Sequence, residues 1–360
     1  MVRVTYIELI DRIYLIGPPG IGKTEIVRQK AIEEARRKGK KFVDLREASS
    51  EQIDEILKNP KEFYVYYRII ATHIFPEDLG IPRERNDFIE FLPPKVLKIL
   101  SIPDVEGVLF IDELNNVQRD DQISMLYSII QEKEASWILK LSQGIKIVCA
   151  GNPSEWSEIV RALPIPLRSR LTIVRVDPPT IDEWIKYMDE KYGNDWERLV
   201  AAYLKTYPSD FIAMPEADDD NYPCPRNWTE VSVLLHKFNN NDEFKEEIVI
   251  GRLGRNVGVK LLSILRTKID VARIVVELSH DPSIFSKLKI EEKVLVLNHI
   301  AQQDINELQK IRKFMEYLAE NDREMLTLVV VLMSKEKRVQ FIKEFKDVAV
   351  KLLKTISQFM

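Results

Sequence analysis

The feature that most constrains this chain is a glycine-rich loop close to its first residue. The loop follows the pattern GxxxxGK[ST] and consists of Gly17, Pro18, Pro19, Gly20, Ile21, Gly22, Lys23 and Thr24. Residues 12–17 are an apolar run that predicts a buried strand, and residues 23–38 contain neither glycine nor proline and predict a helix. The order strand, loop, helix is the arrangement of a phosphate-binding loop, so a parallel α/β fold is the first expectation.

The residue types in this loop suit a bound phosphate chain. Glycines let several backbone N–H groups turn toward phosphate oxygens, and the positive end of the following helix points at the same anion. We expect Lys23 to reach the β- and γ-phosphates of a nucleotide and Thr24 to coordinate Mg²⁺. The plain alternative is an ordinary turn, but with only 12 glycines in 360 residues a chance match is rare.

A second candidate site follows the apolar run 108–111, where Asp112 and Glu113 stand side by side. The carboxyl ends of parallel strands form the edge at which ligands bind in open α/β sheets. We therefore expect Asp112 to hold Mg²⁺ through its water shell and Glu113 to polarise an attacking water. An ordinary strand can also end in two acidic residues, but the position of this pair, about ninety residues after a phosphate loop, favours the functional interpretation.

The rest of the chain predicts two kinds of structure. Further strands are expected at 42–45, 63–71 and 171–176, with helices at 51–58 and 121–133. Residues 76–94 carry four prolines and are predicted to be irregular, and the apolar runs 137–141 and 145–149 flank Ser-Gln-Gly and predict a hairpin. After Pro179 the strand signal ends. Helices are predicted at 180–192, 196–207, 228–238 and 257–269, followed by a helical region whose last helix carries one apolar stripe from Phe341 to Phe359.

Composition limits the class of protein. Hydrophobic residues make up 45% of the chain and charged residues 31%, which excludes bulk disorder. No apolar run approaches the ~20 residues of a membrane helix, and the N-terminal residues lack a signal-peptide pattern. Two cysteines and four scattered histidines have no metal-binding spacing, and a net charge of −4 disfavours a globally basic nucleic-acid binder. We expect a soluble cytoplasmic protein with no membrane partner.

Taken together, the motifs resemble those of AAA+ ATPases, and most closely the MoxR-like branch. The segments that carry the resemblance are GPPGIGKTEIV at 17–27, EDLGIP at 77–82, VLFIDELN at 108–115, CAGNP at 149–153, LPIPLRSRL at 163–171 and CPRNW at 224–228. The resemblance implies an α/β P-loop core at residues 1–178 with a parallel sheet and flanking helices. It also implies a helical lid at 179–270 and a C-terminal helical extension at 271–360, whose role has no assignable motif.

The resemblance also implies roles for individual residues. Glu25 joins the eight loop residues and Asp112 around ATP. Asn152 matches the sensor-1 position, where an amide orients the lytic water or contacts the γ-phosphate, although Asn-Pro after a strand is also a common turn. Arg170 matches an arginine finger supplied to a neighbouring subunit, with Arg168 as the other candidate and surface charge as the alternative for both. Arg226 matches sensor 2, although a residue beside a proline at a helix start needs no such role.

Several functions follow from this resemblance. The first is Mg²⁺-dependent ATP hydrolysis in a homo-oligomeric ring, expected to be a hexamer, that remodels or matures an unidentified protein partner. The alternatives are a nucleic-acid motor or loader of the same fold, a nucleotide-gated binding module with little turnover, and a small-molecule kinase. Within 76–94, we weigh Phe88, Ile89 and Phe91 as a pore-facing or substrate-touching loop against an ordinary surface loop whose apolar residues pack back.

Overall fold

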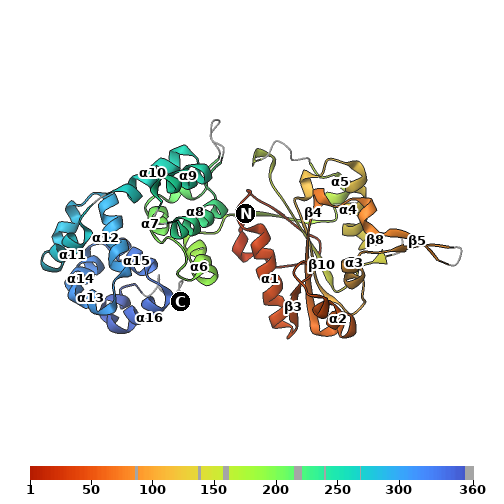
Figure 1. The fold of residues 1–360 in the computed structure, drawn as a ribbon, viewed down its shortest axis with the longest axis horizontal. Helices are drawn as coiled ribbons and strands as arrows, with labels where there is room; N and C mark the ends of the chain where they lie inside the picture. Colours follow the sequence, from red (N-terminus) through yellow and green to blue (C-terminus); the bar gives the residue numbers. More distant parts are fainter. Residues whose placement is uncertain are drawn as a thin grey trace. The chain divides into compact units, whose positions relative to one another are not determined.

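The chain forms two compact units, Met1–Pro178 and Pro179–Met360, in the computed structural model of Figure 1. The structure describes residues 1–85, 88–136, 139–156, 162–214, 221–238, 241–267 and 269–352. The two units differ in kind, because the first is built on a sheet and the second is helical throughout its described residues.

A seven-stranded sheet in the order β1-β11-β2-β10-β7-β4-β3 forms the centre of the first unit. Every pair of neighbouring strands in it is parallel. The strands are β1 (Val2–Arg3), β2 (Ile13–Ile16), β3 (Lys41–Asp44), β4 (Phe63–Ile70), β7 (Glu106–Asp112), β10 (Ile145–Gly151) and β11 (Thr172–Asp177). Two small antiparallel pairs stand outside this sheet, β5 (Ile81–Arg85) with β6 (Phe88–Leu92) and β8 (Glu134–Ser136) with β9 (Leu139–Lys140).

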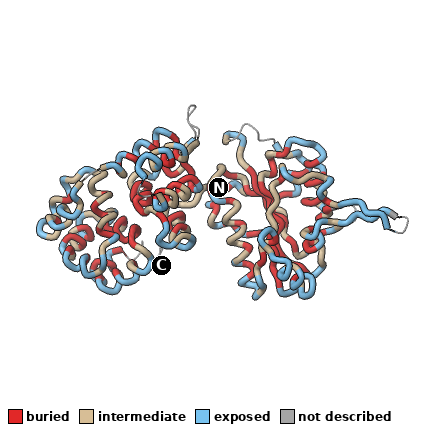
Figure 2. The backbone as a smooth tube through the Cα atoms, viewed as in Figure 1, coloured by how far each residue is buried: buried red, intermediate tan, exposed pale blue. Residues whose placement is uncertain are grey.

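Helices cover both faces of the sheet, and the strands are buried between them (Figure 2). The helices of this unit are α1 (Lys23–Arg37), α2 (Ser50–Lys58), α3 (Lys95–Leu100), α4 (Asp120–Glu132) and α5 (Ile165–Arg168). Short 3-10 turns are η1 (Val4–Tyr6), η2 (Pro60–Glu62), η3 (Ala71–His73), η4 (Pro76–Leu79), η5 (Leu114–Asn116) and η6 (Ser154–Trp156). Strands buried on both faces explain why the sequence reads as continuous apolar runs rather than as an alternating pattern.

The predicted fold class, an α/β core with a parallel sheet and flanking helices followed by a helical region, is confirmed. The apolar runs assigned to strands around Ile13, Val43, Val65 and Leu109 all lie in the sheet. One prediction is wrong: β10 is not the second strand of a hairpin. It lies between β2 and β7 and pairs in parallel with both, because an apolar strand of this length gains more burial inside the sheet than in a hairpin.

The Ser142-Gln143-Gly144 turn instead leads into the sheet. Gly144 N–H donates to Ser142 Oγ at 3.1 Å, and Ser142 Oγ donates to the carbonyl of Val105 at 2.8 Å. The local hairpin is made by β8 and β9, and the predicted strand start at Trp137 and Ile138 lies outside the described residues.

The segment 76–94 is also more regular than predicted. After η4 it forms the antiparallel pair β5–β6, in which Ile81 lies opposite Leu92 and Pro82 opposite Phe91. Prolines are tolerated here because a two-stranded ribbon consists only of edge strands. Ile89 is 69% exposed, so the alternative in which the apolar residues pack back does not describe it, whereas Phe91 is 38% exposed. The side chain of Phe88 lies outside the described residues. Whether they touch a substrate stays a prediction.

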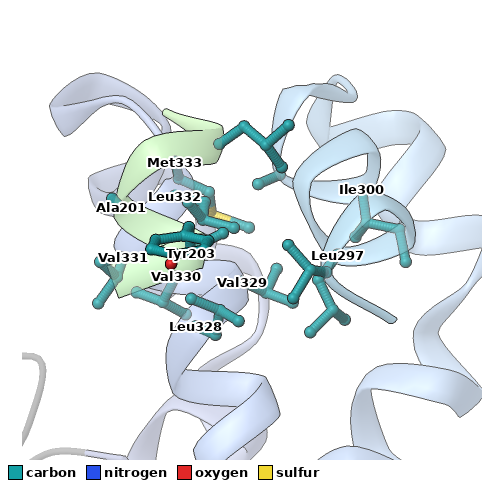
Figure 3. Close-up of a cluster of buried hydrophobic side chains, with 14 of the residues drawn as sticks. Ala201, Tyr203, Leu297, Ile300, Leu328, Val329, Val330, Val331, Leu332 and Met333 are labelled. Carbon is teal, nitrogen blue, oxygen red and sulfur yellow. The ribbon is translucent and has the colours of Figure 1, made fainter. Parts of the chain in front are cut away.

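The second unit consists of helices packed around one continuous apolar core. Its helices are α6 (Ile181–Tyr192), α7 (Leu199–Thr206), α8 (Pro225–Lys237), α9 (Asp242–Leu253), α10 (Arg255–Arg266), α11 (Val271–His280), α12 (Ile290–Gln302), α13 (Ile305–Lys310), α14 (Arg312–Asn321), α15 (Arg323–Leu332), α16 (Lys335–Glu344) and α17 (Lys346–Val350), with the 3-10 turns η7 (Pro208–Phe211) and η8 (Pro282–Lys287). Figure 3 shows Tyr203 of α7 beside Leu297 of α12 and the apolar residues of α15. Residues before and after position 270 therefore share one apolar core. The division at this position into a helical lid and a C-terminal extension stays a prediction.

The single helix expected at the C-terminal end is broken. It forms α16 and α17, separated by Phe345, whose φ of −116° and ψ of 46° are not helical. Phe341, Phe345, Val348 and Leu352 of the predicted stripe are buried, and the break lets residues on both sides reach the same core. The stripe residues Ile356 and Phe359 lie outside the described residues.

None of the helices in the described ranges is both long enough and apolar enough to cross a membrane.

Candidate functional site

The carboxyl ends of three neighbouring strands bring the predicted site residues together in the first unit. In the sheet register Gly151 at the end of β10 pairs with Ile16 at the end of β2, and Cys149 of β10 pairs with Ile111 of β7. The phosphate loop after β2, the acidic pair at the end of β7 and Asn152 after β10 therefore share one edge of the sheet. That is the edge at which open parallel sheets bind ligands.

The phosphate loop needs its glycines for two different reasons. Gly20 and Gly22 have φ values of 76° and 94°, a left-handed backbone that L-residues rarely adopt. Gly17 instead lies so close to β11 that a Cβ there would stand 2.5 Å from the carbonyl oxygen of Val176. The loop is therefore a tight turn between a buried strand and the first turn of α1, and its shape depends on residues without side chains.

Lys23 folds back over the loop at the start of α1. Its Nζ donates to the carbonyl oxygens of Gly17 at 2.7 Å and Pro18 at 2.8 Å, and to Asn152 Oδ1 at 3.0 Å. The side chain is 7% exposed, so the ammonium is desolvated and these acceptors stabilise it. Lys23 thereby links the loop after β2 with the residue after β10.

Thr24 and Asp112 meet directly. Thr24 Oγ1 donates to Asp112 Oδ2 at 2.8 Å, and Asp112 Oδ1 accepts the backbone N–H of Glu113 at 3.0 Å. Asp112 is 6% exposed. The hydroxyl predicted to coordinate magnesium and the carboxylate predicted to hold the ion's water shell are thus neighbours.

Glu113 adopts an uncommon backbone. Its φ of 56° and ψ of 36° place it in the left-handed region, where a residue with a Cβ costs about 1 kcal/mol or more. The turn ends β7 sharply, and among the described residues its carboxylate receives one side-chain hydrogen bond, a long 3.4 Å contact from Asn116 Nδ2. A half-buried acidic group with so loose a partner is available to a water molecule or a ligand.

Asn152 is fixed by a second asparagine that the sequence analysis did not single out. Asn115 Nδ2 donates to the carbonyl of Asn152 at 2.6 Å, and the Asn152 backbone N–H donates to Asn115 Oδ1 at 3.2 Å. Gly151 makes room for this link, since a Cβ there would stand 2.3 Å from both Asn115 Oδ1 and the Tyr14 hydroxyl. Burial raises the pKa of Tyr14 well above its ordinary value, so this phenol stays neutral.

Arg68 of β4 is a second site residue that sequence reasoning missed. Its Nη2 lies 2.8 Å from Asp112 Oδ2, and its Nε donates to the same oxygen at 3.0 Å. The signal in the sequence is a single charged residue inside the otherwise uncharged strand Phe63–Ile70. Arginine rarely enters a central strand without a charged partner.

The residues at this edge fit a triphosphate with magnesium. No atom lies within 4 Å of the Cβ position at Gly22, so there is open space beside the loop. The Lys23 ammonium now uses loop carbonyls and Asn152, which phosphate oxygens can replace because the acceptors are of the same kind. The oxygens of Thr24 and Asp112 suit Mg²⁺, which prefers oxygen ligands and keeps several waters.

Within the described residues of the first unit, the structure does not bring the predicted arginines Arg168 and Arg170 to this cluster. Arg170 is exposed, donates to the Pro166 carbonyl at 2.7 Å and lies over the Tyr127 ring. Arg168 is the last residue of α5 and is exposed, and Arg226 is an exposed residue in the first turn of α8 in the second unit. Glu25 is half-buried in the first turn of α1. Their roles toward a nucleotide stay predictions.

The fold and this edge define the first unit as a parallel α/β unit with a phosphate-binding loop. No protein-family model matches the chain, and the search of curated proteins finds no match. Solved structures do match in fold. A mutant of RuvB from Thermotoga maritima is 17% identical, with 75% of this chain and 70% of that chain covered and a TM-score of 0.30.

Two further solved structures are similar over most of the chain. Cdc6p from Pyrobaculum aerophilum is 14% identical, with 91% of this chain and 88% of that chain covered and a TM-score of 0.36. The ORC2 protein of Aeropyrum pernix, in ADPNP–ADP complexes, is 12% identical, with 95% and 81% covered and a TM-score of 0.33. At such identities and TM-scores these are likenesses of fold only.

Proposed function

We propose that this protein hydrolyses ATP in the presence of Mg²⁺. The observation that carries the proposal is the convergence of Lys23, Thr24 and Asp112 at one edge of the sheet, with Lys23 Nζ 3.0 Å from Asn152 Oδ1 and Thr24 Oγ1 2.8 Å from Asp112 Oδ2. Lys23 and Thr24 begin α1 after the loop that follows β2, Asp112 ends β7, and Asn152 follows β10. Phosphoryl transfer depends on such positioning of charge more than on covalent chemistry by the protein.

Each residue has a defined task in this proposal. The loop amides and Lys23 bind the phosphates, with the Lys23 ammonium exchanging the carbonyls of Gly17 and Pro18 for phosphate oxygens. Thr24 and Asp112 hold Mg²⁺, which when bound neutralises charge that develops on the phosphates. Glu113 accepts a proton from the attacking water, and Asn152, held by Asn115, orients that water.

Glu113→Gln tests the proposal. The variant keeps the shape of the side chain and removes the base, so it should bind a fluorescent ATP analogue as the parent does while phosphate release falls by about 10²-fold or more. Glu55→Gln is the matched control, because Glu55 is an exposed glutamate on α2. Phosphate release at the parent rate in Glu113→Gln would remove Glu113 from this role.

The same experiment separates hydrolysis from a binding module with little turnover. A parent protein that binds the ATP analogue with Mg²⁺ but releases no phosphate, alone or in its oligomer, would favour the binding module. Absence of any nucleotide binding would contradict both, because both depend on the phosphate loop.

The finer parts of the proposal rest on the resemblance to AAA+ ATPases of the MoxR-like branch. In that arrangement the protein is a cytoplasmic homo-oligomeric ring, a hexamer by expectation, and remodels a protein partner. Arg170, or Arg168, completes the site of a neighbouring copy, and both are exposed and so accessible to one. The helical residues 179–270 act as a lid that senses nucleotide through Arg226. Mass measurement of the Glu113→Gln protein with ATP tests the ring.

A nucleic-acid motor or loader is the competing assignment for the partner. It requires that DNA or RNA raise the hydrolysis rate and that the stimulation fall steeply with salt, because phosphate contacts release counterions. A protein partner captured by Glu113→Gln with ATP, with no stimulation by DNA or RNA, would favour the remodelling function.

A further inference from the structure

Arg68 is unusual in its setting. It lies on β4, an inner strand of the sheet (Figure 1), opposite Phe110 of β7 and two residues beyond Tyr66, the last residue that pairs with β3. Its neighbours on the strand are Tyr66 and Tyr67 before it and Ile69 and Ile70 after it. Among the described residues, Asp112 is the only hydrogen-bond or ion-pair partner of its side chain.

The contacts of Asp112 fill one of its two carboxylate oxygens, Oδ2. Oδ2 accepts from Arg68 Nε at 3.0 Å and from Thr24 Oγ1 at 2.8 Å, and Arg68 Nη2 lies 2.8 Å away from it. Oδ1 accepts from the Glu113 N–H at 3.0 Å. Each carboxylate oxygen offers about two lone-pair positions, so three donors crowd Oδ2 while Oδ1 has a single one. A magnesium ion or its water shell can therefore reach Oδ2, the oxygen beside Thr24, only if Arg68 gives up its contacts.

Electrostatic repulsion also favours the release of Arg68 when magnesium binds. A guanidinium beside a divalent ion is repelled, and the repulsion is strong where the shared carboxylate is largely desolvated. The Asp112 side chain is 9% exposed, whereas the Arg68 side chain is 28% exposed. Arg68 also borders an open cavity of about 510 Å³, so its side chain has room to leave.

We infer that, in the absence of metal, the Arg68 guanidinium occupies the place of magnesium beside Asp112. It pairs with this carboxylate until magnesium and nucleotide bind, and then releases it. The inference rests on the proposed nucleotide-binding function and adds to it a positioning residue that sets how strongly nucleotide binding depends on metal. Without metal, Arg68 cancels the negative charge that Asp112 presents to the phosphates. With metal, Arg68 competes for the same carboxylate.

Two effects of opposite sign follow for Arg68→Gln. Nucleotide binding in EDTA should weaken, because Asp112 is then an uncompensated anion beside the phosphates. Magnesium should bind the nucleotide complex more tightly, because its competitor is gone. The ratio of the nucleotide Kd in EDTA to that in saturating Mg²⁺ should therefore rise by about fivefold or more, within the usual range of coupling between two bound ligands.

The measurement uses the full chain, a fluorescent ATP analogue with titrated Mg²⁺, and Mn²⁺ as a metal probe read by electron paramagnetic resonance. Arg68→Lys keeps a cation without the two-pronged contact and should fall between the parent and Arg68→Gln. Arg28→Gln is the matched control. Arg28 Nε lies 3.3 Å from Asp44 and Arg28 Nη2 lies 3.5 Å from Glu47, so this arginine is engaged elsewhere and the ratio should not change.

A ratio that stays at the parent value in both Arg68 variants, with nucleotide binding intact, overturns this inference and leaves the proposed function standing. An equal loss of affinity with and without metal also overturns it, since that is the result of a merely structural role. If Arg68→Gln does not fold, Arg68→Lys decides alone, and an unchanged Mn²⁺ affinity there counts against the inference. A parent protein that binds no nucleotide with Mg²⁺ removes the proposed function itself.

Discussion

The two units of this protein bury polar groups for different purposes. In the first unit the buried polar residues Lys23, Asp112 and Asn115 gather at the carboxyl edge of the sheet, beside the glycine-rich loop. In the second unit three buried charged side chains pair with one another. Asp189 Oδ1 accepts from Arg198 at 2.7 Å, and Asp189 Oδ2 lies 2.8 Å from Arg338 Nη2.

The difference lies in what remains available to a ligand. Arg338 also donates to the carbonyls of Val330 at 3.0 Å and Val331 at 2.6 Å, so its donors are used inside the helical core. The triad of Asp189, Arg198 and Arg338 joins α6, the residue before α7, and α16. In the first unit Lys23 is held by loop carbonyls and Asn152, and Asp112 by Thr24 and Arg68, and these are contacts that a phosphate or a metal can replace. Burial of charge alone therefore does not identify a functional site, and exchangeable partners at a sheet edge are the better sign.

The largest effect on nucleotide binding is expected from Lys23→Ala in the first unit. Loss of the ammonium should weaken ATP binding by at least about 10²-fold, measured with a fluorescent ATP analogue and Mg²⁺. Lys30→Ala is the matched control, because Lys30 is on the same helix and pairs with Glu33 at 3.1 Å instead. ATP affinity equal in Lys23→Ala and Lys30→Ala would contradict the assignment of the phosphate loop.

Arg170→Ala tests whether the first unit needs a second copy of the chain. Turnover should fall by roughly 10³-fold, and mixing with Lys23→Ala subunits should restore part of it, because each variant then supplies what the other lacks. Phosphate release in mixtures of defined ratio measures this. If Arg170→Ala is unimpaired and Arg168→Ala loses turnover, Arg168 is the finger; absence of rescue in any mixture would argue against a shared site.

Asp189→Ala should affect stability rather than nucleotide binding. Removing this carboxylate leaves two buried guanidinium groups without their partner, which should lower the free energy of unfolding by about 3–5 kcal/mol. Chemical denaturation measures the loss, and nucleotide affinity well below the transition should match the parent. Asp242→Ala is a suitable control, since the Asp242 side chain is 93% exposed. A large loss of affinity with little change in stability would show that the triad serves the site.

The smallest effect is expected at the helix caps, where the two units should behave alike. Ser49 forms a capping box with Gln52 at the start of α2, and Thr180 forms one with Glu183 at the start of α6. Ser49→Ala and Thr180→Ala should each cost about 1 kcal/mol of stability by chemical denaturation and leave ATP turnover unchanged. A cap that matters far more in one unit would show that the packing around it, rather than local hydrogen bonding, sets its effect.

Local chemistry made much of this protein predictable. The loop from Gly17 to Thr24 carries its own strand, turn and helix signals, and the residues at the caps of α2 and α6 satisfy their backbone donors within four residues. The apolar runs that form strands could be recognised because a strand buried on both faces is apolar at successive positions, without alternating polar residues. The acidic pair at the end of β7 was predictable for the same reason.

Two predictions fail where a residue's partner lies far away along the chain. The apolar run of β10 predicts half of a hairpin, because the sequence cannot show that β2 and β7 lie on either side of it. The last helix breaks at Phe345 because residues before and after it must reach one core.

The sequence by itself determined that this chain builds a tight glycine-rich loop between a strand and a helix, a parallel sheet and a helical region, since those signals are carried by residues close to one another. Only the tertiary structure decided that Asn115 fixes Asn152 and that Arg68 holds Asp112, contacts that span 37 and 44 residues. The physical reason is that hydrogen bonds and ion pairs depend on distances in space, and strand order and register set those distances.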